Sequence, residues 1–419
     1  MNPGESTLRT RQVQPVGVET LPIPTVFPPA FTGGCAGPIR ERSRLQWRLL
    51  DGGDPAELLA AFLAGEGLPV ADLTRPVPVD HRASTVCGAS LFVSAGAAAV
   101  LVGAPPGASS PVVAVPDLVA VVYEHGGGPP GSARPAAAPP GPESRASPPW
   151  RIGPWRASWT PAQHGGAVAA VRDAIARGDV YQVNLVGHAA AAYAGDPLPA
   201  LRRVTRLPGA RYAGVLTGDG WAVACASPET LVQLTAGGRL LTRPIKGTRP
   251  ATAAGRRELL ASDKERAEHI MIVDLERNDL ARVARTGSVR VDRLYAIRRW
   301  CDLWQAESVV SAALADGAGL ADVLRAVCPG GSVTGAPKLA ALAQIAAREP
   351  VGRGASMGAL GWFGAGRLDL GLTIRTVAVD AARLHVWAGG GITWGSEPTA
   401  EVAEAAAKAT PLINALTSG

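Results

Sequence analysis

Hydrophobic and polar positions alternate most regularly in the second half of the chain. A helix is predicted over residues 160–178, because a Thr-Pro pair starts it, apolar residues recur on one face and a glycine ends it. A strand should follow at residues 180–188, with Gln182 and Asn184 on one face and apolar side chains on the other. Two polar side chains on one strand face line either a cleft or a solvent-exposed edge, and the strand alone favours neither interpretation.

The pattern is weaker in the N-terminal part. Residues 1–35 are rich in proline and lack periodicity, whereas residues 44–63 predict a short helix. The apolar stretch 90–103 predicts core strands, and β-branched runs within residues 97–122, such as Pro-Val-Val-Ala-Val, are also typical of strands.

A segment rich in proline, glycine and alanine at residues 126–150 divides the chain. Its composition cannot pack a core and is typical of a linker or a long surface loop. We therefore expect a β-rich N-terminal portion over residues 1–125 and the catalytic region over residues 151–419. The mixture of predicted helices and strands indicates the α+β class.

Composition narrows the classes of partner. The formal net charge is +6, yet the arginines are scattered and no basic run is interleaved with aromatics, so a small anionic substrate is expected and no nucleic acid. Five widely spaced cysteines without a Cys-x-x-Cys pair indicate neither a disulfide framework nor a zinc site. No signal or membrane-spanning segment is recognised, which predicts a cytoplasmic protein without a membrane partner.

Lysine is rare in this chain, with four lysines against 37 arginines (41 basic residues less four). Unlike arginine, lysine can lose its proton in a buried site and attack carbon. Lys246, within the sequence Pro-Ile-Lys-Gly-Thr, is therefore the candidate nucleophile. The other three are Lys264, Lys338 and Lys408.

A Ser-Pro-Glu sequence ends at Glu229, 17 residues before Lys246. That spacing suits two strands joined by a turn at Gly237-Gly238, which would place Glu229 and Lys246 on one wall. An acid beside a desolvated amine can protonate a leaving hydroxyl while the amine attacks. The alternative is an ordinary ion pair at a strand end.

Two pairs of glutamates have helical spacing. Glu265 and Glu268 share a face of a helix predicted over residues 264–279, and Glu401 and Glu404 share a face of a second helix near the C-terminus. If the pairs face each other, their carboxylates suit a hard divalent cation, for which Mg2+ is the natural choice. Either pair alone is more often a solvated helix face.

Glycine-rich segments accompany these helices. The backbone N–H groups of Gly389-Gly-Gly391 could hold a carboxylate, and Arg375, on a predicted strand, could clamp one. Residues 329–338 superficially resemble a phosphate loop, but Ala-Pro stands where such a loop needs Gly-Lys, and proline lacks the N–H. A glycine turn leading into a helix is expected there, with Lys338 either an anion partner or a surface cation.

Taken together, these motifs resemble the chorismate-utilising enzymes over about residues 160–415. Six segments agree in their order along the chain: residues 178–185 (Gly-Asp-Val-Tyr-Gln-Val-Asn-Leu), 227–229, 244–250, 264–279, 331–338, and 374–376 together with 389–408.

The resemblance implies large antiparallel sheets packed against each other, helices outside them and an active site in the cleft. Lysine in Pro-Ile-Lys-Gly-Thr is typical of the branch that makes 4-amino-4-deoxychorismate from chorismate and ammonia, where anthranilate synthases have alanine. The Lys246 amine would add to C2 of chorismate while Glu229 protonates the leaving C4 hydroxyl. Ammonia would then attack C4 and expel the lysine.

The resemblance also implies the binding residues. Glu268 and Glu404 would hold Mg2+ directly, with Glu265 and Glu401 nearby or bridged by water. The metal would bind the ring carboxylate of chorismate. Further substrate contacts would come from Gly247, Thr248, Arg375, Gly389, Gly390 and Gly391, with Gln182 and Lys408 close by.

Two positions depart from the family pattern. Gln305 stands where the family often has a histidine, which fits a synthase that does not aromatise its product, and Ser356 replaces an expected tyrosine that would contact substrate. No cysteine has the setting of a glutaminase nucleophile, so ammonia is expected from a separate glutaminase subunit or from solution. The product would serve p-aminobenzoate and folate synthesis or a specialised metabolite.

Three alternatives remain. Anthranilate synthesis on the same scaffold is disfavoured by Lys246, and isochorismate synthesis by Gln182, where isochorismate synthases tend to have lysine. A weakly active paralogue that acts as a binding partner for a glutaminase is motivated by Ser356 and Gln305. The intact acid, amine and glutamate pairs argue against that third alternative.

Overall fold

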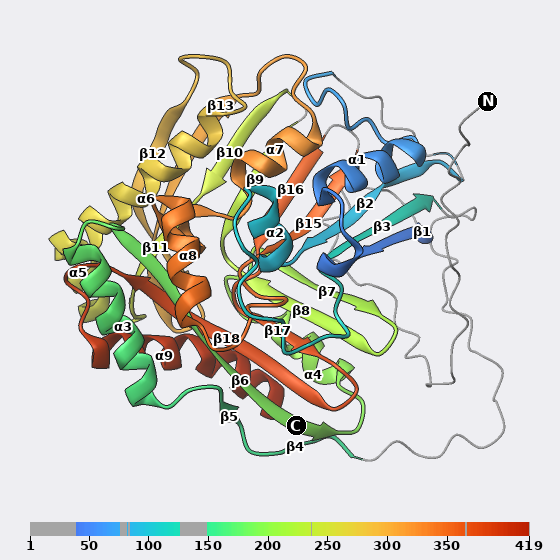
Figure 1. Cartoon of the computed structure of the whole chain (residues 1–419). Coiled ribbons are helices and arrows are strands. Elements are labelled where there is room, and N and C mark those ends of the chain that lie inside the picture. Colours follow the sequence, from blue (N-terminus) through green and yellow to red (C-terminus); the bar gives the residue numbers. More distant parts are fainter. Residues whose placement is uncertain are drawn as a thin grey trace, which may run out of the picture.

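The computed structural model describes residues 39–75, 82, 84–125, 149–235, 237–364 and 367–418. Two large antiparallel sheets pack against each other and the helices cover their outer sides (Figure 1). This confirms the α+β class and the packed-sheet architecture. The predicted lead-in at 1–35 and all but the last two residues of the predicted linker at 126–150 lie outside the described residues.

Ten strands form the larger sheet, and every pair in it is antiparallel. Their order is β1 (Ile39–Trp47), β3 (Leu118–His125), β2 (Val86–Val93), β15 (Ala359–Gly364), β16 (Arg367–Leu372), β9 (Thr230–Leu234), β10 (Arg239–Arg243), β13 (Leu303–Ala313) and β11 (Ile245–Pro250), with β12 (Arg290–Trp300) also paired to β13.

Eight strands form the smaller sheet, again all antiparallel. Their order is β14 (Gly335–Ala336), β6 (Gln182–Ala194), β18 (Arg383–Ile392), β17 (Thr376–Val379), β8 (Trp221–Ser227) and β7 (Tyr212–Gly218), and the short strands β4 (Arg151–Ile152) and β5 (Arg156–Ala157) pair with β6.

The main hydrophobic core lies between the two sheets. It joins Leu91 and Val121 of the larger sheet to Val223 and Trp387 of the smaller one, all of them buried. Burial of this apolar surface is the main favourable contribution to folding. Strands β1, β2 and β3 take part in the same sheet as β15, where Val93 pairs with Ala359.

Nine helices accompany the sheets in the described residues, together with two single 3-10 turns. They are α1 (Pro55–Gly65), α2 (Ala95–Leu101), α3 (Pro161–Ala176), α4 (Leu198–Val204), α5 (Ala253–Ala261), α6 (Asp263–Ala281), α7 (Leu320–Val327), α8 (Lys338–Arg348) and α9 (Pro398–Thr417), and the turns are η1 (Leu49–Asp51) and η2 (Gly331–Val333).

Capping side chains fix the two helices that the sequence predicts best. The Thr160 hydroxyl accepts from the N–H of Gln163, whose side chain returns a bond to Thr160, and the Ser262 hydroxyl accepts from the N–H of Glu265. Both predicted helices are thereby confirmed, as α3 and α6. None of the helices within the described ranges is long and apolar enough to cross a membrane.

Three N-terminal predictions were partly wrong. The predicted helix at 44–63 begins as strand β1, and α1 starts only at Pro55, capped by Asp54. The apolar stretch 90–103 holds strand β2 and then helix α2, because its alanine run has high helix propensity and Ser94 caps it. The Pro-Val-Val-Ala-Val run forms local turns instead of a strand, with Val112 N–H bonded to Ser110 Oγ.

Candidate active site

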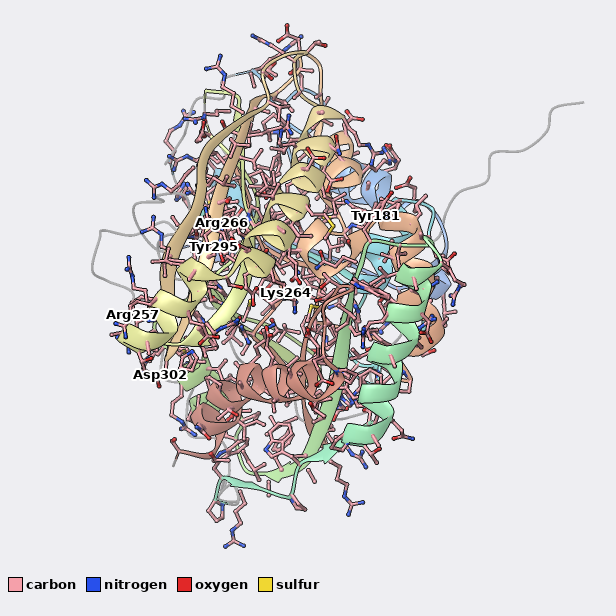
Figure 2. The ribbon with its side chains drawn as sticks, turned by 90° about the vertical axis from the view of Figure 1, so that its left-hand side faces the viewer. Tyr181, Arg257, Lys264, Arg266, Tyr295 and Asp302 are labelled. Carbon is pink, nitrogen blue, oxygen red and sulfur yellow. The ribbon has the colours of Figure 1, made fainter. Side chains whose placement is uncertain are left out.

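A cleft of about 850 Å³, counted with its open mouth, lies where the two sheets meet. Strands β11 and β13 line it from the larger sheet, β6 and β18 from the smaller one, and α6 and α9 bring their acidic side chains to it. Figure 2 looks onto this face, with Lys264 of α6 near its centre. Of the fourteen predicted site residues, twelve line the cleft: Glu229, Lys246, Gly247, Thr248, Glu265, Glu268, Arg375, Gly389, Gly391, Glu401, Glu404 and Lys408.

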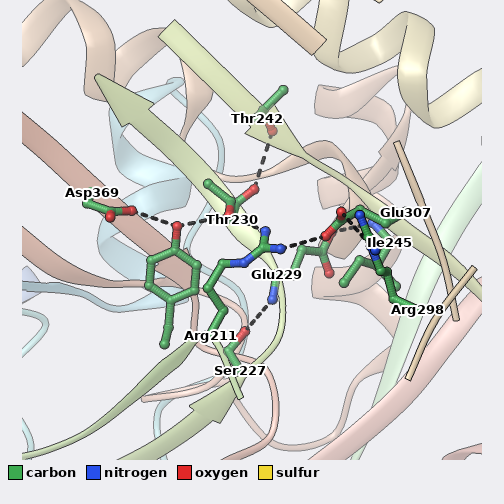
Figure 3. Close-up of polar contacts among 10 residues, drawn as sticks. Arg211, Ser227, Glu229, Thr230, Thr242, Ile245, Arg298, Glu307 and Asp369 are labelled. Carbon is green, nitrogen blue, oxygen red and sulfur yellow. Dashed lines mark hydrogen bonds and ion pairs between the residues drawn. The ribbon is translucent and has the colours of Figure 1, made fainter. Parts of the chain in front are cut away.

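Glu229 sits in a turn made by its own motif. The Ser227 hydroxyl accepts from the Glu229 N–H at 3.2 Å, and Glu229 Oε1 accepts from the N–H of Ile245 at 3.2 Å (Figure 3). The side chain is 3% exposed. Burial raises the pKa of the Glu229 carboxyl, against the opposing charges of Lys246 and Arg375. A carboxyl held this way can carry a proton into the cleft.

The turn at Gly237-Gly238 joins β9 to β10, and Lys246 is the second residue of the next strand, β11, so it is not part of the predicted strand pair. Glu229 and Lys246 nevertheless both line the cleft, on one wall. The Lys246 Nζ donates to the backbone carbonyl of Ser332 at 3.0 Å. Burial lowers the pKa of the Lys246 amine and the charge of Lys408 lowers it further, while the carboxylates of Glu229, Glu268 and Glu404 oppose both. The net shift favours the neutral amine that a nucleophile requires.

The two glutamate pairs face the same cleft from α6 and α9. Burial raises the pKa of Glu265 and of Glu401. For Glu404, burial acts upward, but the cations around it, first Lys408 with its Nζ at 2.6 Å and then Lys246 and Arg249, together hold the pKa of that carboxyl below its ordinary value. Neither pair is therefore a solvated helix face.

The carboxylates of the cleft have other partners as well as room for a cation. Glu265 pairs with Arg249 at 3.0 Å and Glu268 accepts from Thr393 at 2.6 Å. In the part of the chain that the structure describes, no three His, Cys, Asp or Glu side chains are grouped closely enough to hold a metal. Mg2+ commonly uses one or two carboxylates, several waters and the substrate. Four carboxylates around one cleft fit that mode of binding and do not fit a cage made by the protein alone.

Arg375 differs from its prediction because it precedes β17 instead of lying on a strand, with a φ of +53°. Its Nη1 donates to the carbonyl of Lys408 at 3.0 Å, its guanidinium lies 4.4 Å from the ring centre of Trp300, and its buried Nε has no hydrogen-bond partner. Burial lowers the pKa of Arg375 to about 10. A desolvated cation with an unused donor beside the cleft suits an anionic ligand.

The glycine-rich segment, whose N–H groups were expected to be able to hold a carboxylate, lies within strand β18 and pairs with β6. A Cβ on Gly391 would lie 2.1 Å from Gln182 Nε2 and 2.9 Å from Lys246 Nζ, and one on Gly390 would lie 2.9 Å from Glu401 Oε2. The glycines therefore leave the room that these side chains occupy. Gly390 and Gln182, the two predicted residues that do not line the cleft, lie next to residues that do, Gly390 against Glu401 and Gln182 against Gly391.

The polar face of β6 is buried, so the solvent-edge interpretation of Gln182 and Asn184 is wrong. Three polar side-chain atoms there have no hydrogen-bond partner: Oε1 and Nε2 of Gln182 and Nδ2 of Asn184. Buried polar atoms without partners are uncommon and point to a bound molecule or water. Asn184 lines the cleft but was not predicted as a site residue, although its spacing from Gln182 on the strand was a usable signal.

Several other cleft residues were also missed. Ser332 lies within residues 331–338, one of the segments that carry the family resemblance, whereas nothing in the local sequence marks Met357 or Trp387. Of the two departures from the family pattern, Gln305 lines the cleft, while Ser356 is buried and donates to the Thr373 carbonyl at 3.2 Å.

Residues 329–338 form η2, β14 and the start of α8, as expected of a glycine turn leading into a helix. Lys338 is neither an anion-site residue of the cleft nor a surface cation. Its Nζ lies 2.7 Å from Asp279 Oδ2, and both side chains are nearly buried.

Comparison with known proteins identifies a family. The chorismate binding enzyme family model matches residues 130–414. Aminodeoxychorismate synthase component 1 of Klebsiella aerogenes is 39% identical over 63% of this chain and 60% of its own length. Anthranilate synthase component 1 of Streptomyces coelicolor is 40% identical over 62% of this chain and 53% of its own. The chain thus spans at most about 60% of these two relatives.

Solved structures share the fold. Anthranilate synthase component I from Streptococcus pneumoniae superimposes with a TM-score of 0.70 and 24% identity, over 97% of this chain and 95% of the other. A putative 2,3-dihydroxybenzoate-specific isochorismate synthase from Bacillus anthracis gives 0.65 and 19%, over 92% and 96%. Because the family model covers well over half of the sequence and the fold agrees, the chain belongs to the chorismate-binding enzymes.

Proposed function

We propose that this protein makes 4-amino-4-deoxychorismate from chorismate and ammonia. The observation that carries the proposal is the Lys246 amine, which lies in the cleft beside Glu229 and has a lowered pKa. Overall similarity does not decide the product, since relatives named for aminodeoxychorismate and for anthranilate synthesis are about equally similar.

Lys246 and Glu229 would carry the chemistry. The neutral Lys246 amine adds to C2 of chorismate, and the C4 hydroxyl leaves as water with a proton from Glu229. Ammonia then adds to C4, the bond between C2 and Lys246 breaks, and the amine is restored. The directions of both pKa shifts, upward for Glu229 and downward for Lys246, favour the protonation states that this sequence begins with.

Binding and orientation would fall to the other cleft residues. Arg375 would offer its unused Nε to a carboxylate of chorismate, and Thr248 and Lys408, which also line the cleft, would offer further polar contacts. Glu268 and Glu404 would hold Mg2+, with Glu265 and Glu401 nearby, and the metal would supply positive charge for the ring carboxylate. Holding a dianion in one orientation makes a weak nucleophile effective.

The ammonia would come from a separate glutaminase subunit. The relatives' names, which call them component 1, support a partner subunit for this chain as well. The product would feed p-aminobenzoate and folate synthesis or a specialised metabolite, in the cytoplasm.

The test is consumption of chorismate with Mg2+ and an ammonium salt, with products identified by mass. We expect aminodeoxychorismate from the wild type and a large loss of rate in Lys246→Ala. Arg257→Ala, at the exposed edge of the same face (Figure 2), is the control and should keep the wild-type rate. Anthranilate with release of pyruvate, isochorismate, or binding without turnover would each refute the proposal in favour of the corresponding alternative.

A further inference from the structure

A buried carboxyl lies behind the cleft wall, among residues that do not line it. Glu276 is on α6, eight residues after Glu268, and is 3% exposed. Its Oε1 accepts from the N–H of Gly331 at 3.2 Å, and its Oε2 lies 3.0 Å from the hydroxyl of Thr242. The mechanism proposed above gives this residue no role.

The first of these bonds sets the position of the η2 turn. A Cβ on Gly331 would lie 2.7 Å from Leu275 Cδ2, so the turn packs directly on α6. The next residue, Ser332, accepts from Lys246 Nζ through its carbonyl at 3.0 Å. Glu276 therefore holds the turn whose carbonyl holds the amine.

The second bond reaches the strands that carry the acid and the amine. The Thr242 hydroxyl lies 3.4 Å from the carbonyl of Thr230, a contact drawn as a dashed line in Figure 3, and Thr230 directly follows Glu229. Thr242 itself is four residues before Lys246. A single carboxyl thus connects the three segments that present Glu229, Lys246 and the Ser332 carbonyl.

We propose that Glu276 is a positioning residue for Lys246, acting through the Gly331–Val333 turn and through Thr242, and that it does so as a neutral acid. A threonine hydroxyl has one proton to give. That proton has two acceptors within reach, Glu276 Oε2 at 3.0 Å and the Thr230 carbonyl at 3.4 Å. A protonated Glu276 donates to Thr242 while accepting from Gly331, which leaves the Thr242 proton for the Thr230 carbonyl, so both acceptors are satisfied. Only the expected effect on turnover rests on the proposed function.

The surroundings of Glu276 favour the protonated form. Burial, helped by the charge of the neighbouring Asp279 and opposed by Lys338, raises the pKa of Glu276 to about 8. Glutamine has the same shape and likewise presents one donor group and one acceptor oxygen, so it should replace a neutral glutamic acid here without loss.

The experiment measures the amine directly, independently of turnover. The chain's four lysines are trace-labelled with acetic anhydride across a pH series, and labelling of Lys246 relative to the exposed Lys264 is read by peptide mass spectrometry. Wild type and Glu276→Gln should give the same titration of Lys246. Glu276→Ala should move it upward toward the ordinary lysine value, with kcat reduced at least tenfold and KM little changed.

Two further variants keep the test decisive. Thr242→Val, which removes the other arm without changing side-chain shape, should move the titration in the same direction by less. Leu63→Ala, in the buried face of distant α1, should lower the melting temperature without changing the titration of Lys246. An unchanged Lys246 titration in both Glu276→Ala and Thr242→Val would overturn the positioning role. If Glu276→Gln shifts the Lys246 titration as much as Glu276→Ala does, the proposal that Glu276 acts as a neutral acid is overturned.

Discussion

Two buried arginines beside the cleft are used in opposite ways. Arg353 is 8% exposed and Arg375 is 5% exposed. Arg353 makes a two-point ion pair with Glu349, at 2.6 and 2.8 Å, and donates to the carbonyls of Asn184 and Val333, at 2.7 and 2.6 Å. Arg375 donates to one carbonyl, lies over a tryptophan ring and keeps an unused Nε, with no ion pair to a carboxylate among the described residues.

The difference indicates that Arg353 holds the structure of the cleft and that Arg375 binds a ligand in it. Both Asn184 and Val333 line the cleft, so Arg353 fixes its walls, and each of its three guanidinium nitrogens donates to the protein. A buried charge without a full set of partners is costly, and a protein that keeps one retains a donor for something it binds. Substitutions at the two arginines should accordingly affect different properties.

The largest effect is expected on stability, from Arg353→Met. Removing one member of a buried ion pair leaves the other uncompensated and costs about 3–5 kcal/mol. Here the Glu349 carboxylate, whose pKa burial already raises, would lose its partner. Urea unfolding of the variant should show this loss of free energy of unfolding.

Adding Glu349→Leu to Arg353→Met should recover part of that loss, because no buried charge then remains unpaired. A single variant as stable as the wild type would contradict the architectural role of Arg353. So would a double variant less stable than the single one.

A smaller effect, on activity, is expected from Arg375→Met. Loss of a desolvated donor to a substrate carboxylate should lower kcat/KM by about 100-fold, or about 2.7 kcal/mol. The free energy of unfolding should stay the same or rise, because an incompletely paired buried charge is removed. The measurements are chorismate kinetics and urea unfolding, with Arg257→Met as the surface control. If Arg375→Met lowers the free energy of unfolding and leaves the chorismate kinetics unchanged, Arg375 has a structural role like that of Arg353.

The smallest effect is expected from Lys408→Met, on the pH dependence. Lys408 lowers the pKa of Lys246, and it also pairs with Glu404, which raises that pKa. Removing Lys408 takes away a positive charge that lowers the pKa of Lys246. It also leaves the Glu404 carboxylate without its partner, so both changes should raise the pKa of Lys246. Since the neutral amine reacts, the acidic limb of kcat should move to higher pH. A limb that stays in place, or moves lower, would show that Lys246 does not govern it.

The sequence predicted well those elements that depend on interactions between residues close in the chain. Helices α3 and α6 begin at Thr160 and Ser262 caps, and Glu229 and Lys246 meet because their segments are close in the chain. Features that depend on distant pairing were not predictable in this way. The Arg353 contacts with Asn184 and Val333 and the Glu276 bond to Gly331 join segments 20 to 169 residues apart. Strand β1 became clear only through its pairing with β3.

The cleft is lined by both sheets, so a molecule that fills it contacts both of them. Such a molecule adds to the apolar packing that holds the two sheets together. Occupancy should then be visible as resistance to heat, since a ligand at 100 times its Kd adds about 2.7 kcal/mol to the folded state. Thermal unfolding with chorismate and its analogues would rank candidate ligands without any assay of turnover, including for variants whose chemistry has been removed.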